Sequence, residues 1–460
     1  MIRFSNILKI LIILLPVSCI AQKTVKPNIV IILADDLGYA DVGFHGSDIH
    51  TPNLDKLAQE GVRLENFHSC PMCSPTRAGL MTGRYPIRFG MMRAVVPPQR
   101  NYGLDPNEQI LPEMLAEAGY KYRGIFGKWH LGHLQTKWHP INQGFTDFVG
   151  CYNGAADYFT RKREGEIDWH HNSETLKTEG YTTDLITDAA INFIQKVPRD
   201  EPYFLYVPFT APHSPFQAKE KDIDKYMHRK DKKKRIYAAM VDCMDQGIGK
   251  ILKSIDKRGD RENTFILFFS DNGGVKNVGS NSPMVGHKLT VYEGGIRVVA
   301  VGHYPNGNIS GGIIVNELMG YIDVFPTLKA LARDKKPNNH QLDGINVLEA
   351  LNGSQTLPKR PWFTYLDQNP NQMQWVAVNL ENKKLIIQGE LENSDAKKNL
   401  YSIDEKKLEN QISEKYRKAV CDSLFKIANH YLGLKLENQI DQYPVGKEEF
   451  IAPRDWIIRN

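Results

Sequence analysis

Short apolar runs, each followed by polar residues, constrain the fold of this chain most strongly. The first is residues 28–34, and later strands are predicted at 122–126, 203–209 and 264–269. A continuous apolar run of this length is typical of a strand that is covered on both faces of its sheet. Amphipathic helical patterns at 183–196 and 236–257 alternate with the runs. We therefore predict an α/β fold, with a large mixed but mainly parallel sheet flanked by helices.

Boundary signals place further elements. Thr51 as N-cap, Pro52 at the first position and Gly61 as the stop predict a helix between them. A capping-box pattern predicts a second helix start at Asp105. After about residue 355 the pattern changes. Hairpin strands are expected at 375–378 and 384–387, a strand at 400–403 and a polar helix from about Glu409.

With 460 residues, the chain is long for one domain. We expect a main domain over residues 27–350 and a small C-terminal α+β subdomain over residues 355–460.

The N-terminus has the pattern of a targeting segment. Arg3 precedes an apolar stretch over residues 7–17, which is too short to span a bilayer and is followed by small residues. We predict a signal peptide over residues 1–21, or a lipoprotein signal over residues 1–18 that leaves Cys19 as a lipid anchor. Pro16 departs from the usual lipoprotein pattern. Either alternative predicts export, to a bacterial periplasm or as an outer-membrane surface lipoprotein, with membrane contact only through the Cys19 anchor.

Charge and cysteine usage narrow the class of protein. The formal net charge is +5, and much of it lies in residues 221–235. This run is either a solvated helix face or a patch that attracts polyanions. Neither a phosphate loop nor zinc-finger spacing accompanies this run, so we expect no nucleic-acid partner. The six cysteines form no paired framework typical of a disulfide scaffold. Cys70 and Cys73 form a C-x-x-C, but no second ligand pair completes a metal or redox site.

Oxygen-bearing side chains follow two of the apolar runs. Asp35 and Asp36 come directly after residues 28–34, and Asp271 and Asn272 follow residues 264–269. In open α/β sheets, ligands bind at the carboxyl ends of the strands. Such oxygens suit a hard divalent cation such as Ca²⁺. Taken singly, the same residues also fit an N-cap with a solvent-facing neighbour and an ordinary turn.

Charged and nucleophilic side chains occupy similar positions. In Cys73-Ser-Pro-Thr-Arg77, Pro75 fits the first turn of a helix, so Cys73 and Arg77 share one face near its positive end. Cys73 could be a thiolate nucleophile or a small buried residue. Three more candidate residues are Lys128, His130 and His213. They offer a fixed charge and two proton carriers, although a surface lysine, a packing histidine and a structural turn are the plain alternatives.

In order, spacing and local sequence, these clusters together with residues 286–295 resemble the type I, formylglycine-dependent sulfatase family of the alkaline-phosphatase-like superfamily. The resemblance covers roughly residues 27–350 and includes the C-x-P-x-R signature at Cys73. Segments 45–47, 83–88 and 127–132 are most similar to the arylsulfatase B, or N-acetylgalactosamine 4-sulfatase, type.

The resemblance implies a set of site residues. A formylglycine-generating maturation enzyme would convert Cys73 to 3-oxoalanine, the nucleophile. One Ca²⁺ would be held by Asp35, Asp36, Cys73, Asp271 and Asn272. Arg77, Lys128 and Lys288 would bind the sulfate. His213, with Lys288, would protonate the leaving sugar oxygen, and His130 would deprotonate the formylglycine hydrate to resolve a covalent sulfate intermediate.

The resemblance also implies the substrate class, which is sulfate esters of carbohydrates. We expect oligosaccharides from an algal polysaccharide such as ulvan, or from a glycosaminoglycan. The aromatic, basic and histidine-rich segment 151–183 is expected to contact the sugar, or to be a plain surface insertion. Three alternatives stay open: a phosphoesterase of the same superfamily, a non-catalytic glycan-binding protein on this scaffold, and a cysteine hydrolase.

Overall fold

A computed structural model describes residues 26–391, 393, 395–404, 406–412 and 418–457. The predicted signal segment and Cys19 lie outside these residues. Within the described ranges, the search for a helix long and apolar enough to cross a membrane finds none.

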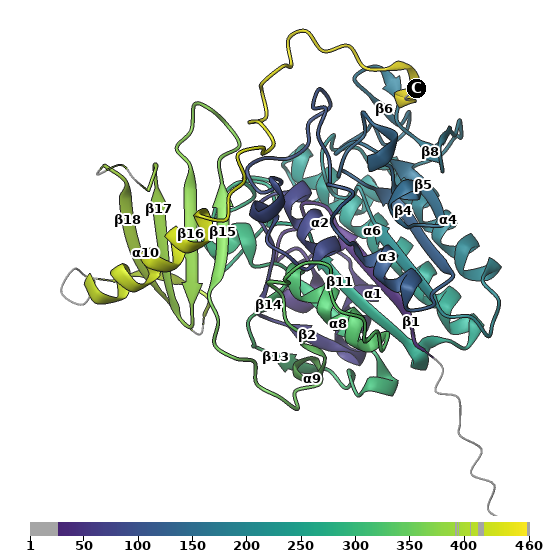
Figure 1. Ribbon diagram of the computed structural model, residues 1–460. Coiled ribbons are helices and arrows are strands. Elements are labelled where there is room, and N and C mark those ends of the chain that lie inside the picture. Colours follow the sequence, from purple (N-terminus) through teal and green to yellow (C-terminus); the bar gives the residue numbers. More distant parts are fainter. Residues whose placement is uncertain (1–25, 392, 394, 405, 413–417, 458–460) are drawn as a thin grey trace, which may run out of the picture.

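The main sheet confirms the predicted α/β fold. In spatial order, its ten strands are β13 (Ile313–Val315), β2 (Val62–Leu64), β12 (Ala300–His303), β11 (Thr264–Ser270), β1 (Asn28–Ala34), β10 (Tyr203–Pro208), β4 (Tyr122–Lys128), β5 (Asp147–Cys151), β8 (His170–His171) and β9 (Glu174–Thr175). The central strands from β11 to β5 all pair in parallel. The four predicted apolar runs are β1, β4, β10 and β11, which lie side by side at the centre (Figure 1).

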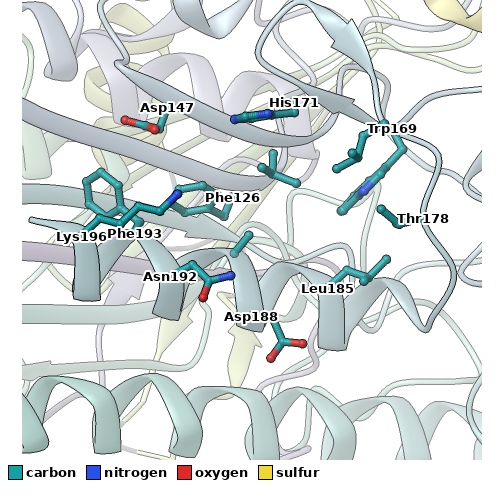
Figure 2. Close-up of a pocket in the computed structure, with 13 residues that line it drawn as sticks. Phe126, Asp147, Trp169, His171, Thr178, Leu185, Asp188, Asn192, Phe193 and Lys196 are labelled. Carbon is teal, nitrogen blue, oxygen red and sulfur yellow. The ribbon is translucent and has the colours of Figure 1, made fainter.

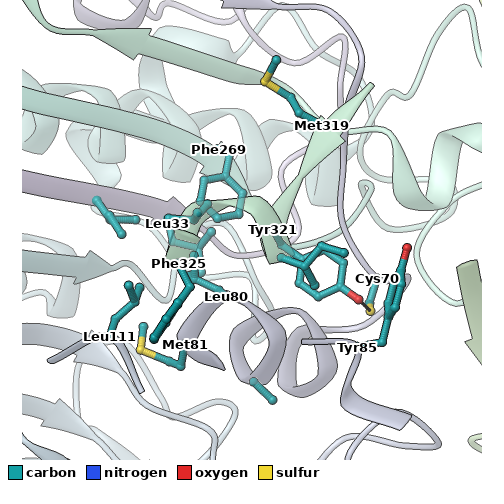
Figure 3. Close-up of a cluster of buried hydrophobic side chains, with 14 of the residues drawn as sticks. Leu33, Cys70, Leu80, Met81, Tyr85, Leu111, Phe269, Met319, Tyr321 and Phe325 are labelled. Carbon is teal, nitrogen blue, oxygen red and sulfur yellow. Dashed lines mark hydrogen bonds between the residues drawn. The ribbon is translucent and has the colours of Figure 1, made fainter. Parts of the chain in front are cut away.

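Helices cover both faces of this sheet, which explains why β1 is apolar at every position after Asn28. Side chains of β1 alternate between two cores: Ile29, Ile31 and Leu33 face one, and Val30 and Ile32 face the other. The first core includes residues of α2 (Cys73–Thr82), α3 (Leu111–Glu117) and α8 (Val324–Leu331), several of which are drawn in Figure 3. The second includes residues of α1 (Pro52–Glu60), α4 (Thr182–Lys196) and α6 (Lys232–Arg258).

Short elements complete the main part of the chain. They are α5 (Glu220–Ile223), α7 (Glu293–Ile296), α9 (Leu348–Leu351), the hairpin β6 (Lys162–Arg163) and β7 (Glu166–Ile167), and the pair β3 (Phe67–His68) and β14 (Met319–Gly320). The basic run 221–235 lies over α5 and the start of α6, where Lys232, Lys233 and Lys234 are exposed.

The helix predicted to start at Asp105 starts at Leu111 instead. Asp105 forms a turn, in which its carbonyl accepts the backbone N–H of Glu108 at 3.0 Å. The cap comes from Glu113, whose carboxylate accepts the N–H of Ile110 at 3.0 Å. The start signal at Asp105 was therefore a turn signal.

A second, antiparallel sheet follows the first. Its strands are β15 (Trp362–Leu366), β16 (Trp375–Leu380), β17 (Lys383–Gln388), β18 (Lys397–Ile403) and β19 (Glu409–Gln411), and α10 (Lys418–Leu432) packs against it. The helix expected from about Glu409 is α10, which is described from Lys418; its expected start is wrong, because Glu409 opens the edge strand β19. One face of this sheet joins the first core of the main part through Val376, Val378 and Leu385.

The last described residues return to the main part of the chain. We call residues 438–457 the C-terminal strap. In Figure 1 this yellow segment leaves the second sheet and ends beside β6. Its Ile440 N–H donates to the Gly90 carbonyl at 2.9 Å. The indole of Trp456, which is fully buried, donates to the Arg163 carbonyl at 3.0 Å.

Candidate active site

The ends of four neighbouring strands bring the predicted site residues together. The parallel register pairs Ala34 with Ser270 and Leu33 with Pro208, so the residues after β1, β11 and β10 emerge at one edge of the sheet. The Asp271 N–H donates to the Ala34 carbonyl at 3.0 Å, and the Asp35 N–H donates to the Ala211 carbonyl at 3.0 Å. Strand β4 ends beside them with Lys128.

Three buried carboxylates cluster at this edge. One oxygen from each of Asp35, Asp36 and Asp271 lies within 4.8 Å of the others. Asn272 joins them, since its amide donates to Asp36 Oδ1 at 2.8 Å. Buried oxygens normally have hydrogen-bond partners, yet Asp35 Oδ1 and Asn272 Oδ1 have none among the described residues. A hard, oxygen-preferring cation fits this donor set.

Three basic side chains face the carboxylates. The buried Arg77 guanidinium donates to Asp271 Oδ2 from Nε and Nη2, at 3.1 and 2.8 Å, and Lys128 Nζ donates to Asp35 Oδ2 at 2.7 Å. Lys288 Nζ lies 2.7 Å from Asp36 Oδ1. Burial alone would raise the pKa of Asp36, but Lys288 and His213 outweigh burial and hold that pKa below its usual range.

Cys73 is the first residue of α2, a helix whose ten residues are all buried. Its side chain is 2% exposed and packs with residues of the second sheet, among them Ala377 and Ile386. Its Sγ and ligand atoms of Asp35 and His213 all lie within 4.8 Å of one another. Burial raises the pKa of the Cys73 thiol, so the side chain is a neutral thiol at neutral pH.

The two predicted proton carriers differ in setting. His130 Nε2 lies 3.0 Å from the Val96 carbonyl, and its buried Nδ1 has no hydrogen-bond partner among the described residues. Burial and then Lys128 lower its pKa well below the usual value. His213 is partly exposed, and its Nε2 lies 3.6 Å from Asp36 Oδ2. Burial and then Lys288 lower the pKa of His213 to about 3.

The backbone of the site is held in unusual conformations. Asp36, His130 and Leu289 have φ values of 70°, 60° and 65°, which place three non-glycine residues in the left-handed region. Such residues cost roughly 1–3 kcal/mol each and cluster at functional sites. The His130 ring also packs closely against Gly154, where a Cβ atom would lie 2.4 Å from His130 Nε2. The loop backbone therefore fixes the position of the His130 ring.

A cavity of about 410 Å³ opens over these residues, and its lining includes Cys73, His130, His213 and Lys288. Segment 151–183, expected to contact the sugar, contributes Gly154, Ala155 and Arg163 to the wall. The aromatic and histidine residues that suggested this role do not line it. Tyr152, Tyr158 and His170 are buried, and Trp169 and His171 line a separate cavity of about 300 Å³ beside α4 (Figure 2).

Sequence reasoning missed one buried charge network next to the site. Glu293, at the end of the Lys288 loop, accepts from Lys384 Nζ of β17 at 2.9 Å and lies 3.2 Å from His68 Nε2. Lys384 also lies 2.9 Å from Glu409 Oε1, and all three side chains of this Lys–Glu–Glu group are at most 1% exposed. The signal of it in the sequence was a lysine directly before an apolar run (Lys384-Leu-Ile-Ile) in a predicted strand.

Comparisons with known proteins give the family of this chain. The Sulfatase family matches residues 27–334. Human N-acetylgalactosamine-6-sulfatase is 36% identical over 365 residues, which cover 74% of this chain and 68% of the human protein. Mouse arylsulfatase J is 36% identical over 345 residues, which cover 73% of this chain but only 57% of the mouse protein. The structure of Ps i-CgsB in complex with k-i-k-neocarrahexaose has 31% identity and a TM-score of 0.83, and the match covers 92% of this chain and 96% of that one.

Fold and site together define an α/β protein with a buried acidic cluster, opposed by fixed cations, at the carboxyl edge of a parallel sheet. The comparisons give the family. The chain belongs to the sulfatase family.

Proposed function

We propose that this protein is a sulfuric ester hydrolase that removes sulfate from carbohydrates, using Cys73 converted to formylglycine. The observation that supports it most is the cluster of Asp35, Asp36 and Asp271 opposed by Arg77, Lys128 and Lys288, with Cys73 beside it. Three carboxylates and three cations balance each other. A bound Ca²⁺ would leave a net positive charge, which suits a sulfate ester.

The residues present fit both groups that the family implies. Asp35, Asp36, Asp271 and Asn272, with the modified residue 73, would hold one Ca²⁺, which supplies charge stabilisation when bound. Formylglycine at position 73 would supply a hydroxyl nucleophile, which the neutral thiol described above does not. Arg77, Lys128 and Lys288 would bind and orient the sulfate oxygens.

Two histidines would move protons in this proposal. His130 is neutral, and its Nδ1 has no hydrogen-bond partner in the described part of the chain, so this nitrogen can accept a proton. His213 would donate a proton to the leaving sugar oxygen. Since its pKa is about 3 here, that role requires the negative charge of the bound ester, which raises the pKa of a nearby histidine. Lys288 stays protonated, because Asp36 outweighs burial and raises the pKa of Lys288.

The substrate class is a proposal of the same kind. The cavity wall and the oligosaccharide in the structure of Ps i-CgsB both support sulfated oligosaccharides, from an algal polysaccharide or a glycosaminoglycan, as the proposed substrates. The arylsulfatase B likeness stays a prediction. We also propose export, to the periplasm or as a Cys19-anchored surface lipoprotein, from the segment that lies outside the described residues.

The test compares ester classes on the purified protein, co-expressed with a formylglycine-generating enzyme. We expect sulfate release from sulfated oligosaccharides, little phosphate release from matched phosphate esters, and a mass change on the peptide that contains residue 73. The Cys73→Ala variant should lose turnover and keep its fold by circular dichroism. Faster phosphate release would favour the phosphoesterase alternative. An unmodified Cys73 in the native host, with glycan binding but no turnover, would favour the binding protein. Inhibition by thiol alkylation would favour the cysteine hydrolase.

A further inference from the structure

The floor and the mouth of the active cavity are built from different parts of the chain. On the floor, Cys73 and His130 are 2% and 4% exposed. Arg163, Gln368 and Tyr443 line the same cavity and are partly exposed, so they lie nearer its opening. Arg163 is on β6, Gln368 follows β15, and Tyr443 is on the C-terminal strap. The mouth is therefore completed by segments far from the sulfatase motifs.

The charged residues of the cavity lining are cations, and their carboxylate partners lie outside the lining. Among the described residues that line it, none is Asp or Glu, whereas Lys288 and Arg163 are cationic. Lys288 is paired with Asp36 at the floor. Arg163 Nε is enclosed without a hydrogen-bond partner among the described residues, and it lies 3.5 Å from the exposed Glu164. A guanidinium on a cavity wall, with an Nε that has no hydrogen-bond partner among the described residues, is well suited to bind an oxyanion.

The C-terminal strap holds the hairpin that carries Arg163. The Arg163 carbonyl accepts the indole N–H of Trp456, whose ring packs edge-on against His133 with the centroids 5.3 Å apart. On the opposite strand of the hairpin, Glu166 accepts the Asp455 N–H at 2.9 Å. A residue whose backbone is fixed before binding loses less conformational freedom when a ligand arrives.

Hydrogen bonds also fix the part of the strap that borders the cavity. The Gln99 side chain donates to the Tyr443 carbonyl at 2.7 Å, and Arg100 pairs with Asp441 at 2.7 Å. The Tyr443 N–H donates to the Gln368 carbonyl at 2.8 Å, which joins two of the mouth residues directly. The part of the cavity wall beside Arg163 is therefore held in place by these hydrogen bonds.

We propose that Arg163 forms a second anion-binding subsite, which binds a sulfate or carboxylate on the same oligosaccharide whose sulfate ester lies at the cavity floor. This inference rests on the proposed function and adds a preference for substrates that carry two anionic groups. Arg163 acts in binding and takes no part in the chemical step. Trp456 is a positioning residue that acts through the Arg163 backbone.

The test uses the full-length, matured enzyme and four substrates: a disulfated disaccharide, a monosulfated disaccharide with a uronate, a monosulfated neutral disaccharide and 4-methylumbelliferyl sulfate. For Arg163→Gln we expect kcat/KM to fall about ten- to a hundredfold on a substrate with a second anion, mainly through KM, as for a lost charge-assisted contact. The two substrates without one should change less than about twofold. The first two substrates distinguish sulfate from carboxylate as the bound group.

Two further variants separate binding from structure. Lys162→Gln removes a charge from the same hairpin at an exposed position outside the cavity lining, and should leave all four substrates unchanged. Trp456→Phe keeps an aromatic ring but loses the hydrogen bond to Arg163, and should raise KM for the dianionic substrates alone.

Equal losses of Arg163→Gln on all four substrates, or no loss on the dianionic ones, would overturn the subsite. If the wild-type enzyme hydrolyses none of the esters, the proposed function fails instead. Calorimetric titration of the same disaccharides into wild type and Arg163→Gln then decides the subsite separately. A weaker Kd for the dianionic disaccharides in the variant would support it, and equal Kd values would refute it.

Discussion

The Lys384 network gives a sharp stability prediction. Lys384→Met would leave Glu293 and Glu409 buried near each other without the ammonium that lies 2.9 Å from each. Removing one partner of a buried ion pair costs about 3–5 kcal/mol, because a charge stays buried without compensation. Glu293 keeps His68 and Arg297 as partners, whereas Glu409 loses its only ion pair among those that the described residues form. We therefore expect a loss of about 3 kcal/mol, near the lower end of that range.

Urea unfolding followed by tryptophan fluorescence measures the effect, because Trp362 is buried in β15 of the same sheet. Lys383→Met is the matched control: this neighbouring lysine is partly exposed, and its Nζ donates to Ser402 Oγ at 3.2 Å. It should change the free energy of unfolding by less than about 0.5 kcal/mol. The double variant Lys384→Met/Glu409→Gln should recover part of the loss. A Lys384→Met protein as stable as the control would refute the reasoning.

Three other predictions concern the site and its surroundings. Cys73→Ser should keep the fold and lose turnover at least about a hundredfold, since a serine hydroxyl lacks the second hydroxyl of a formylglycine hydrate; sulfate release and circular dichroism check this. Chelation of Ca²⁺ should lower both activity and stability. The free energy of unfolding should fall by about 2.7 kcal/mol relative to protein with Ca²⁺ at a hundred times its Kd, as measured by denaturation with and without EGTA. His133, whose pKa burial lowers to about 4, binds its proton more readily in the unfolded chain. The contribution of neutral His133 to the free energy of unfolding should be present above pH 6.5 and lost as the pH falls towards 4, by about 3 kcal/mol at most. The His133→Gln variant should show a flatter pH dependence of unfolding.

Local patterns were enough to locate the fold and the floor of the site. Strands β1, β4, β10 and β11 were predictable because a strand covered on both faces is mostly apolar along its buried length. Since parallel strands end at one edge, the polar residues after them had to meet there. Asp35, Lys128, His213 and Asp271 are brought together for this reason.

Features that depend on contacts between distant segments could not be predicted in the same way. Asp105 carries a helix-start pattern that is used in a turn, and Glu409 is drawn into an edge strand by pairing with β18. Arg163 and Tyr443 lie some 280 positions apart in the sequence, and no local sequence pattern predicts that they line the same cavity. The Lys384 network is of this kind too, because its partners come from three separate segments.

The burial of α2 has a consequence for whether Cys73 is modified before or after the chain folds. All ten residues of the helix are buried in the folded chain, where Cys73 lies at the floor of the cavity and shares a buried cluster with Ala377 and Ile386 of the second sheet. A maturation enzyme needs the side chain and its neighbours in reach, so we expect the proposed conversion of Cys73 to take place on the unfolded chain. Folding would then bury the helix with the converted residue in place. We expect a molecule that folds first to keep the thiol, and refolding in the presence of the maturation enzyme to restore the conversion.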